Sequence, residues 1–327
     1  MKYEYTNPLI EQRADPYIYR HIDGHYYFTA SVPEYNRIIL RKSKTIQGLA
    51  TAEEKVIWKA HESGAQSVHI WAPELHFQDG NWYMHYAAGG LDEDIWKIRP
   101  YVIENTSENP MEGDWAEKGM VQTSDKDDFS FTDFSLDATV FEHNDKSYYI
   151  WAQKENNISN LYMDELVNPW TIRGEPMLLS TPDYAWEKIG FWVNEGADVI
   201  KRNGKIFVTF SASATDDNYA IGLLSADEDS DMMDPASWSK HPEPVLKSNE
   251  ETSQYGPGHS TFTVAEDGVT DILAYHARSY KEIDGNPLYD PNRHARVKVL
   301  KWNEDGTPNF GIPHGDGMVD GPIIDDN

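Results

Sequence analysis

Short apolar segments rich in β-branched and aromatic residues recur along the chain in pairs, and each pair is joined by a polar turn. Such pairs are typical of antiparallel β-hairpins. Five of them align on one another, with turns anchored at Gly24, Gly80, Lys146, Gly204 and Gly268. The anchors are spaced 56, 66, 58 and 64 residues apart. Self-similarity at such a period indicates a repeat architecture.

Hairpins repeated around an axis form a β-propeller, whose radial arrangement leaves only short, protected sheet edges. The sequence therefore predicts an all-β fold, a five-bladed β-propeller with four-stranded antiparallel blades around a central channel. The predicted blades span residues 14–67, 68–132, 133–190, 191–255 and 256–312, followed by a C-terminal strap over 313–327. We expect a single catalytic domain over residues 1–327, because the repeats leave no room for another.

The residue nine positions before each turn anchor defines a candidate site. These residues are Asp15, Trp71, Asp137, Glu195 and His259. The first strand of a propeller blade runs beside the channel, so residues at equal offsets are expected to form a ring around it. Acidic residues are 55 of 327, so five random positions would hold fewer than one, whereas this ring holds three. Like charges raise one another's pKa and reduce stability, which makes such a cluster a candidate functional site.

Charge and composition exclude several classes of partner and chemistry. The net charge of −27 repels phosphate backbones and anionic lipids, so neither nucleic acid nor a membrane is an expected partner. Carbohydrate is compatible with this charge, and the 11 Trp, 19 Tyr and 11 Phe residues offer faces on which sugar rings can pack. The absence of cysteine excludes disulfides and thiolate chemistry. No apolar signal segment begins the sequence, so we expect a cytoplasmic protein, or a secreted one if a signal was removed.

Five motifs at the ring resemble those of glycoside hydrolase family 43, and the resemblance covers nearly the whole chain. The motifs are Ala14-Asp15-Pro16, His69-Ile70-Trp71-Ala72-Pro73-Glu74, Ser135-Leu136-Asp137-Ala138, Asn194-Glu195-Gly196 and Gly256-Pro257-Gly258-His259-Ser260. Within that family, residues 30–35 and 290–302 look most like the exo-acting α-L-arabinofuranosidases. The resemblance implies a carbohydrate-cleaving enzyme that acts on arabinose-containing oligosaccharides or polysaccharides.

Cleavage of a glycosidic bond needs an acid to protonate the leaving oxygen and a carboxylate to activate water or attack the sugar. Asp15, Asp137 and Glu195 can supply this chemistry with one carboxylate to spare. The resemblance implies that Asp15 is the general base, that Glu195 is the general acid, and that Asp137 orients Glu195 and tunes its pKa. It also implies inversion of the anomeric configuration.

Aromatic residues near the ring and one late arginine are candidates for substrate binding. Trp71 can offer a platform for a sugar ring, Tyr35 lies in a loop that could face the channel mouth, and Phe191 and Trp192 precede Glu195. Arg296 matches the family's late arginine, which reaches the substrate and the orienting aspartate. His259 would lie near the channel axis, where the resemblance implies a structural calcium or sodium ion held mainly by water. No cofactor is expected for the chemistry.

The sequence thus predicts an inverting exo-α-L-arabinofuranosidase that removes terminal arabinofuranose from arabino-oligosaccharides or arabinan. A β-xylosidase or a bifunctional enzyme is an alternative, since a furanose and a xylopyranose can present similar hydroxyls to one pocket. A noncatalytic carbohydrate-binding propeller is the alternative from another class. In that protein the carboxylates would only accept hydrogen bonds from sugar hydroxyls.

Overall fold

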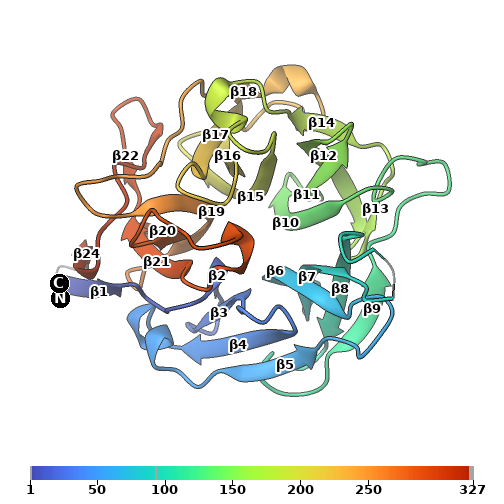
Figure 1. Cartoon of the computed structure of the whole chain (residues 1–327), viewed down its shortest axis with the longest axis horizontal. Helices are drawn as coiled ribbons and strands as arrows, with labels where there is room; N and C mark the ends of the chain where they lie inside the picture. The colour runs from blue at the N-terminus through green and yellow to red at the C-terminus, as the bar shows by residue number, and fades with distance from the viewer. Residues whose placement is uncertain (1, 93, 324–327) are drawn as a thin grey trace.

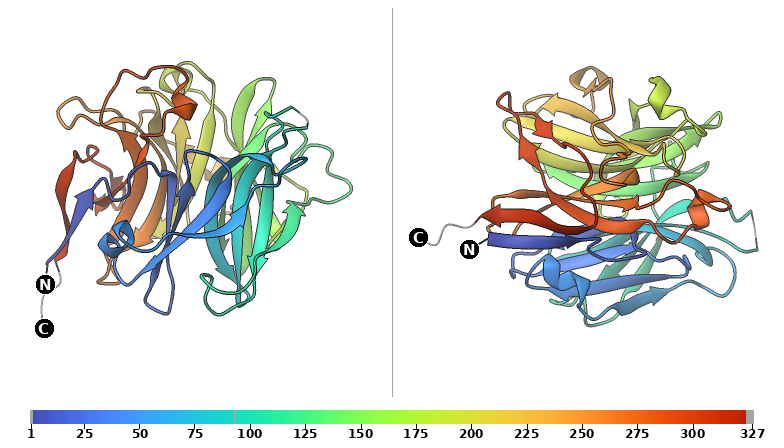
Figure 2. Two further views of the ribbon diagram at one scale, coloured as in Figure 1. Left: turned by 60° about the horizontal axis from the view of Figure 1, so that its bottom comes forward. Right: turned by 60° about the vertical axis from the view of Figure 1, so that its left-hand side comes forward.

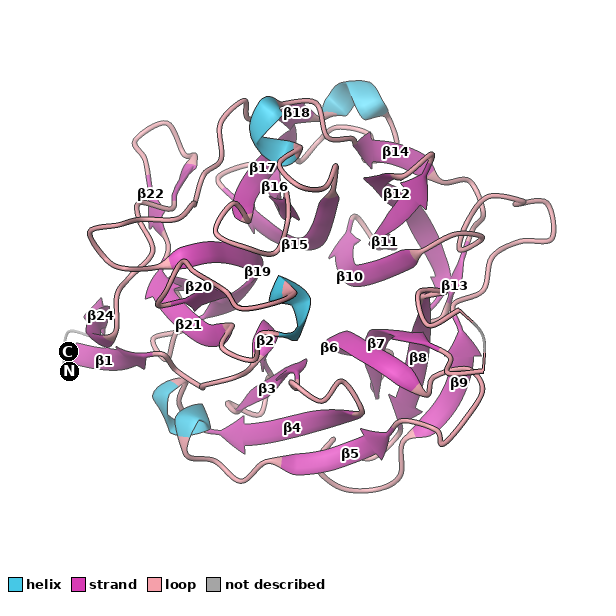
Figure 3. Ribbon diagram, in the orientation of Figure 1, coloured by secondary structure: helices cyan, strands magenta, loops and turns pink. Residues whose placement is uncertain are grey.

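The computed structural model describes residues 2–92 and 94–323, in which antiparallel sheets surround a central axis (Figure 1). This arrangement confirms the predicted five-bladed β-propeller. Between the strands, the described residues form only short 3₁₀ helices (Figure 3): η1 (Gln47–Ala50), η2 (Ala185–Glu187), η3 (Pro235–Ser237) and η4 (Pro287–Tyr289). None of these helices is long and apolar enough to cross a membrane.

In each blade the first strand lies at the axis and the chain then moves outward strand by strand (Figure 1). The strands of the first two blades are β2 (Ala14–Arg20), β3 (Tyr26–Ser31), β4 (Arg37–Ser43) and β5 (Lys55–Lys59), then β6 (Val68–Gln78), β7 (Asn81–Gly89), β8 (Arg99–Asn105) and β9 (Ala116–Met120).

The third and fourth blades repeat this order, except that two short strands of the third blade both pair with its strand β12. Their strands are β10 (Ser135–His143), β11 (Lys146–Glu155), β12 (Ile158–Asn168), β13 (Thr171–Ile172) and β14 (Met177–Ser180), then β15 (Asn194–Arg202), β16 (Lys205–Ala212), β17 (Ala220–Asp227) and β18 (Ser239–Lys240).

The fifth blade differs from the predicted four strands, because its sheet holds three: β19 (Tyr255–Val264), β20 (Asp271–Arg278) and β21 (His294–Val299). The N-terminal segment lies along its outer strand, where the amide of Leu9 donates to the carbonyl of Ala295 at 2.8 Å. Residues from the start of the chain thereby close the propeller on its last blade.

Two further strand pairs lie beyond the fifth blade. Strand β22 (Lys301–Trp302) pairs with β23 (Pro308–Asn309), and β1 (Lys2–Asn7) pairs with β24 (Gly317–Ile323). The second pair brings the two ends of the chain side by side (Figure 2). Residues 317–323 of the predicted C-terminal strap therefore form a strand, and its residues 324–327 lie outside the described part of the chain.

Apolar side chains fill the spaces between neighbouring blades. Trp82 of β7 is fully buried, and its ring lies 5.7 Å from Tyr19 and 5.2 Å from Tyr27 in the first blade. Trp151 of β11 is likewise buried, against Phe131 and Tyr162. Burial of large aromatic side chains stabilises the fold and sets how far apart the blades stand. The first strands of the blades are thereby held in fixed positions at the axis.

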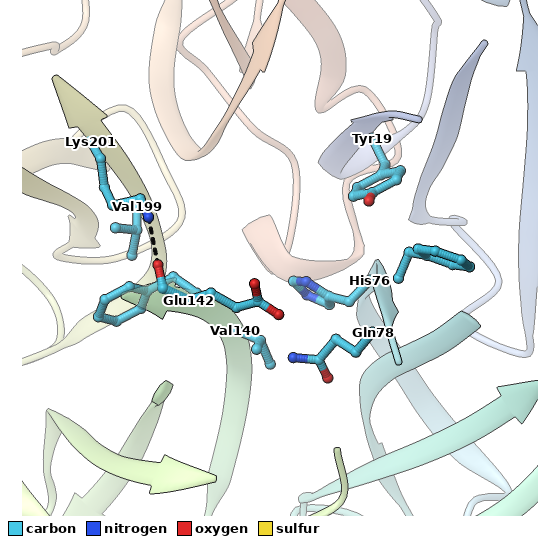
Figure 4. A pocket seen from close by; sticks show the side chains of 9 residues that line it. Tyr19, His76, Gln78, Val140, Glu142, Val199 and Lys201 are labelled. Atoms are coloured by element: carbon cyan, nitrogen blue, oxygen red, sulfur yellow. Dashed lines mark hydrogen bonds between the residues drawn. The ribbon is translucent and has the colours of Figure 1, made fainter. Parts of the chain in front are cut away.

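The two ends of these inner strands differ. Their far ends surround a hollow of about 280 Å³, lined by residues that include Tyr19, His76, Gln78, Val140, Glu142 and Lys201 (Figure 4). The candidate ring residues lie at the opposite ends of the same strands, where each strand begins. Buried polar residues lie between the two, among them Glu74 and Asp198. Burial raises the pKa of both carboxyl groups, to about 8 for Asp198.

Candidate active site

A β-bulge interrupts each of the five inner strands close to its start, because the pairing with the second strand shifts register there. At each bulge one residue has a positive φ: Asp15 (52°), Ala72 (43°), Asp137 (52°), Gly196 (57°) and His259 (44°). Such angles are uncommon for residues other than glycine and are often found at functional sites. The bulges therefore mark one end of the channel as the candidate site.

The bulges also correct the alignment of the predicted ring. Asp15, Asp137 and His259 are themselves bulge residues, whereas Trp71 and Glu195 immediately precede theirs and pair with Ala87 and Ser211. The cause is that the five anchors are not equivalent. The loop between Arg20 and Tyr26 is longer than that between Gln78 and Asn81, and Lys146 follows its turn whereas Gly80 and Gly204 lie within theirs. The ring residues still lie at one end of the channel, but in two adjacent positions of the repeat.

Side chains from the second strand of one blade hold the bulge of the next blade. In three of the five blades an amide in the bulge donates to such a side chain, and this hydrogen bond fixes the two blades relative to each other. The bonds are Asp15 N to His276 Nδ1 at 3.1 Å, Ala72 N to Ser31 Oγ at 2.8 Å, and His259 N to Ser211 Oγ at 2.7 Å. The site is therefore positioned by contacts between blades.

Asp15 lies among hydrogen-bond donors and cations. The hydroxyl of Ser31 donates to its Oδ2 at 2.5 Å, while Oδ1 lies 3.4 Å from His259 Nδ1 and 3.6 Å from Arg293 Nη1. Burial alone would raise the pKa of Asp15, but His259 and Arg293 hold it well below its usual value. Since burial lowers the pKa of His259, Arg293 is the cation that persists at neutral pH. Asp15 is consequently ionised there and can accept a proton.

Asp137 shares a neighbour with Asp15 but has the opposite protonation preference. Its Oδ2 lies 3.7 Å from the same His259 nitrogen. Burial is the main cause that raises the pKa of Asp137 well above its usual value, and the charges of Glu195 and Asp15 raise it further. A carboxyl group in this position favours the protonated form at neutral pH.

Glu195 is the second residue of β15 and is partly buried. Burial raises the pKa of Glu195 to about 7, the hydrogen bond from Tyr219 opposes that rise, and the charge of Asp15 adds to it. The Tyr219 hydroxyl donates to Oε1 of Glu195 at 2.8 Å. About half of Glu195 is therefore protonated at neutral pH, and the group can release its proton there, which is what a general acid requires.

Trp71 and Tyr35 form part of one wall of the site. The Trp71 ring stacks on His69 at 4.5 Å and meets the edge of Tyr35 at 5.7 Å. The buried indole N–H of Trp71 has no hydrogen-bond partner within the described chain. The hydroxyl of Tyr35 donates to the carbonyl of Leu288, in the loop that carries η4 over the centre of the propeller (Figure 3). This loop bridges the fifth blade and the first at the site.

Phe191 and Trp192 lie on the segment that leads into β15, at the end that carries Glu195. Their side chains are 68% and 50% exposed, which is unusual for such large apolar groups. The ammonium group of Lys188 lies 4.7 Å above the ring of Trp192. Both aromatic residues are thus open to a ligand at the rim of the site, rather than part of its buried wall.

The structure corrects the prediction for Arg296. Its guanidinium is buried and donates to Asp316 at 2.6 Å, so it does not pair with a carboxylate of the site. Arg293 takes that position, 3.6 Å from Asp15, and it donates to the hydroxyl of Tyr35 at 2.7 Å. The two arginines are three residues apart in an extended segment, where an odd spacing places side chains on opposite faces.

The candidate ion site at His259 offers fewer protein ligands than a site in which side chains alone coordinate a metal. Among residues 2–92 and 94–323, no group of three or more His, Cys, Asp or Glu side chains is arranged to hold a metal. Nδ1 of His259 faces Asp15 and Asp137, and no hydrogen bond of its Nε2 is found within the same residues. That nitrogen fits the single protein ligand of a cation held mainly by water, so the ion stays a prediction.

Comparison with known proteins identifies relatives over most of the chain. The model of the glycosyl hydrolases family 43 matches residues 5–308. The extracellular exo-alpha-(1->5)-L-arabinofuranosidase of Streptomyces avermitilis is 53% identical over 318 residues, which cover 96% of this chain and 65% of that protein. The enzyme of the same name from Streptomyces chartreusis is 54% identical over 286 residues, 86% of this chain and 85% of that protein.

A solved structure is similar over nearly the same length. The crystal structure of an alpha-L-arabinofuranosidase from Lactobacillus brevis superimposes with a TM-score of 0.91 at 53% identity, and covers 95% of this chain and 98% of that one. By contrast, the chain spans less than two thirds of the length of the S. avermitilis protein, which therefore contains residues without a counterpart here.

Proposed function

The chain belongs to glycoside hydrolase family 43, and from this premise we propose that it is an inverting exo-α-L-arabinofuranosidase. Its substrates would be arabino-oligosaccharides or arabinan, from which it releases terminal arabinofuranose. The observation that carries the proposal is the opposite protonation of two carboxyl groups in one site. Asp15 is held ionised beside Arg293, and Glu195 has a pKa of about 7. The choice of arabinofuranose as the sugar rests on the names of the relatives.

In this mechanism Asp15 takes a proton from a water molecule while the water oxygen forms a bond to the anomeric carbon. Glu195 gives its proton to the glycosidic oxygen, and the bond between that oxygen and the anomeric carbon breaks with its electron pair on the oxygen. Asp137 lies near both and, in its protonated form, adds no negative charge that would raise the pKa of Glu195 further. Attack on the face opposite the leaving group inverts the configuration.

The pH dependence of kcat/KM should follow from these two groups. Glu195 must be protonated, so the rate should fall by about tenfold per pH unit above a pKa near 7. Asp15 must be ionised, and its lowered pKa places the acidic limb far below neutrality. Initial rates on arabino-oligosaccharides across pH would check this, because their alkoxide leaving group needs the proton of the acid. A profile that rises through pH 7 would contradict the assignment of Glu195 as the acid.

Product analysis tests the proposed activity directly. With linear α-1,5-arabinan we expect arabinose as the only early product, released first as the β-anomer, which proton NMR can detect. Release of mixed oligosaccharides would instead show endo action. A comparison of nitrophenyl arabinofuranoside with nitrophenyl xylopyranoside separates the β-xylosidase and bifunctional alternatives. Sugar binding without any turnover would favour the noncatalytic propeller.

The relatives also bear on location. Both Streptomyces proteins are named as extracellular, which favours the secreted alternative over the cytoplasmic one for this chain. An extracellular enzyme would meet arabinan and its branched fragments directly. A net charge of −27 is compatible with neutral polysaccharide. If a cation binds near the axis, Nε2 of His259 would hold it, and its role would be structural.

A further inference from the structure

Tyr219 lies at the end of the segment that joins β16 to β17 and has no place in the repeated motifs of the inner strands. Its side chain is 2% exposed, and its hydroxyl donates to Oε1 of Glu195 at 2.8 Å. Burial, followed by the charges of Glu195 and Asp137, raises the pKa of Tyr219 well above its usual value. Tyr219 is thus a donor at every pH at which Glu195 titrates.

The ring of Tyr219 is held by two neighbours. It stacks parallel to His276, with an angle of 3° between the rings and 5.8 Å between their centroids. The ring also lies against Gly258, where a Cβ would come within 2.1 Å of it. Only glycine leaves space for the tyrosine at that point, which gives a physical reason for the glycine before His259. Packing against His276 and Gly258 consequently fixes the ring so that its hydroxyl points to Glu195.

The stacked pair of Tyr219 and His276 also contacts the proposed base, Asp15. Nδ1 of His276 accepts the backbone N–H of Asp15 at 3.1 Å, so this nitrogen is unprotonated. Burial lowers the pKa of His276 to about 4, which keeps the ring neutral in the working range. One stacked pair therefore contacts the residues proposed as acid and base, Glu195 through a hydroxyl and Asp15 through its amide.

We propose that Tyr219 is a positioning residue for proton transfer, an inference that rests on the proposed function of Glu195. By donating to Oε1, Tyr219 leaves Oε2 to carry the proton. When that proton passes to the glycosidic oxygen, the O–H bond at Oε2 breaks and Glu195 becomes a carboxylate. A hydrogen bond to a carboxylate is stronger than one to a neutral carboxyl, so the Tyr219 bond strengthens as the transition state forms.

Tyr219→Phe is the test, because it removes the hydroxyl and keeps the ring that stacks on His276. We expect kcat on arabino-oligosaccharides to fall by about 10- to 100-fold, the usual range for a hydrogen bond to a charged group. The loss should be smaller on nitrophenyl arabinofuranoside, whose good leaving group needs less help from an acid. The basic limb of the pH profile should also move to higher pH, since the Tyr219 hydrogen bond lowers the pKa of Glu195.

The other charged or titratable groups near Glu195 remain unchanged in this variant, so the shift can be assigned to the hydroxyl. They include Asp15 on β2, Asp137 on β10, Lys154 on β11, His259 on β19, His276 on β20 and Arg293 before β21. Tyr149→Phe is a matched control, because the buried hydroxyl of Tyr149 has no partner among the residues described. That control should keep the rate and pH profile of the unchanged protein.

The outcomes separate this proposal from the proposed function. An equal loss on both substrates with an unmoved basic limb, or no loss at all, would overturn the role of Tyr219 and leave the activity intact. A Tyr219→Phe protein that cannot fold would overturn it as well, since the hydroxyl is given no role in folding. If the unchanged protein cleaves no glycoside, the function itself fails. If it prefers a xyloside, the same comparison is made with xylosides.

Discussion

Replacement of Glu195 with glutamine should lower kcat on arabino-oligosaccharides by about 10²- to 10⁴-fold, the usual contribution of a general acid. Glutamine keeps an oxygen that can accept the Tyr219 hydrogen bond, and it has no proton to give to a leaving alkoxide. The loss should be much smaller on nitrophenyl arabinofuranoside, because nitrophenolate leaves without protonation. The basic limb near pH 7 should disappear, since the group that titrates there is gone.

Glu142→Gln is a matched control for this variant. Glu142 lies at the far end of an inner strand, beside the hollow at the other face of the propeller (Figure 4). The same change of charge there should leave the rate and its pH dependence intact. Steady-state kinetics on both substrates, with thermal unfolding to confirm the fold, gives the result. Full activity of Glu195→Gln on oligosaccharides would remove Glu195 from the chemistry.

The architecture could be predicted because each hairpin carries its own local signals. Alternating apolar segments and Asp-Gly or Asn-Gly turns recur at a similar spacing, so the number of blades follows from the sequence. The fifth blade could not be predicted in the same way. Its outer edge is completed by the contact of Leu9 with Ala295, two residues at opposite ends of the chain. No local pattern encodes such a contact.

The site was predictable to within one residue. A common offset from the turn found Asp15, Asp137 and His259 in the bulges, but it misplaced Trp71 and Glu195 by one position relative to them. Counting from the turn assumes equivalent anchors, but the hairpin loops differ in length, and Lys146 is the first residue after its turn whereas Gly80 lies within its turn. The register of a strand depends on its turn, so one extra residue in the turn shifts the count to every equivalent position in that strand.

Residues outside the inner strands were missed. Arg293, His276 and Tyr219 reach the carboxylates from a loop, from a second strand and from the segment before β17. Their positions depend on how the blades meet, which the repeat does not show. The sequence carried one indirect signal for Tyr219, which is an absence of side chains next to the inner strand of the fifth blade. Two glycines flank Pro257, and the close approach of Tyr219 to Gly258 explains one of them.

Replacement of Asp15 with asparagine should also lower kcat by about 10²- to 10⁴-fold, and here the loss should be similar on both substrates. Activation of water is needed whatever the leaving group is, so a nitrophenyl aglycone cannot compensate for the missing base. The basic limb near pH 7 should remain, because Glu195 is still present. The pair of variants therefore assigns acid and base by opposite responses to the leaving group.

Azide provides a second readout for Asp15→Asn. As an anion it needs no base, so it should attack the anomeric carbon of nitrophenyl arabinofuranoside as the bond to nitrophenolate breaks, and yield an arabinosyl azide of inverted configuration. Asp23→Asn, on the turn of the same hairpin, is the control and should behave like the unchanged protein. The Asp15 variant should also unfold at a lower temperature, because it leaves buried Arg293 without its carboxylate partner. If Asp15→Asn folds and hydrolyses both substrates at the original rate, Asp15 is not the base, and the site would have to activate water through another group.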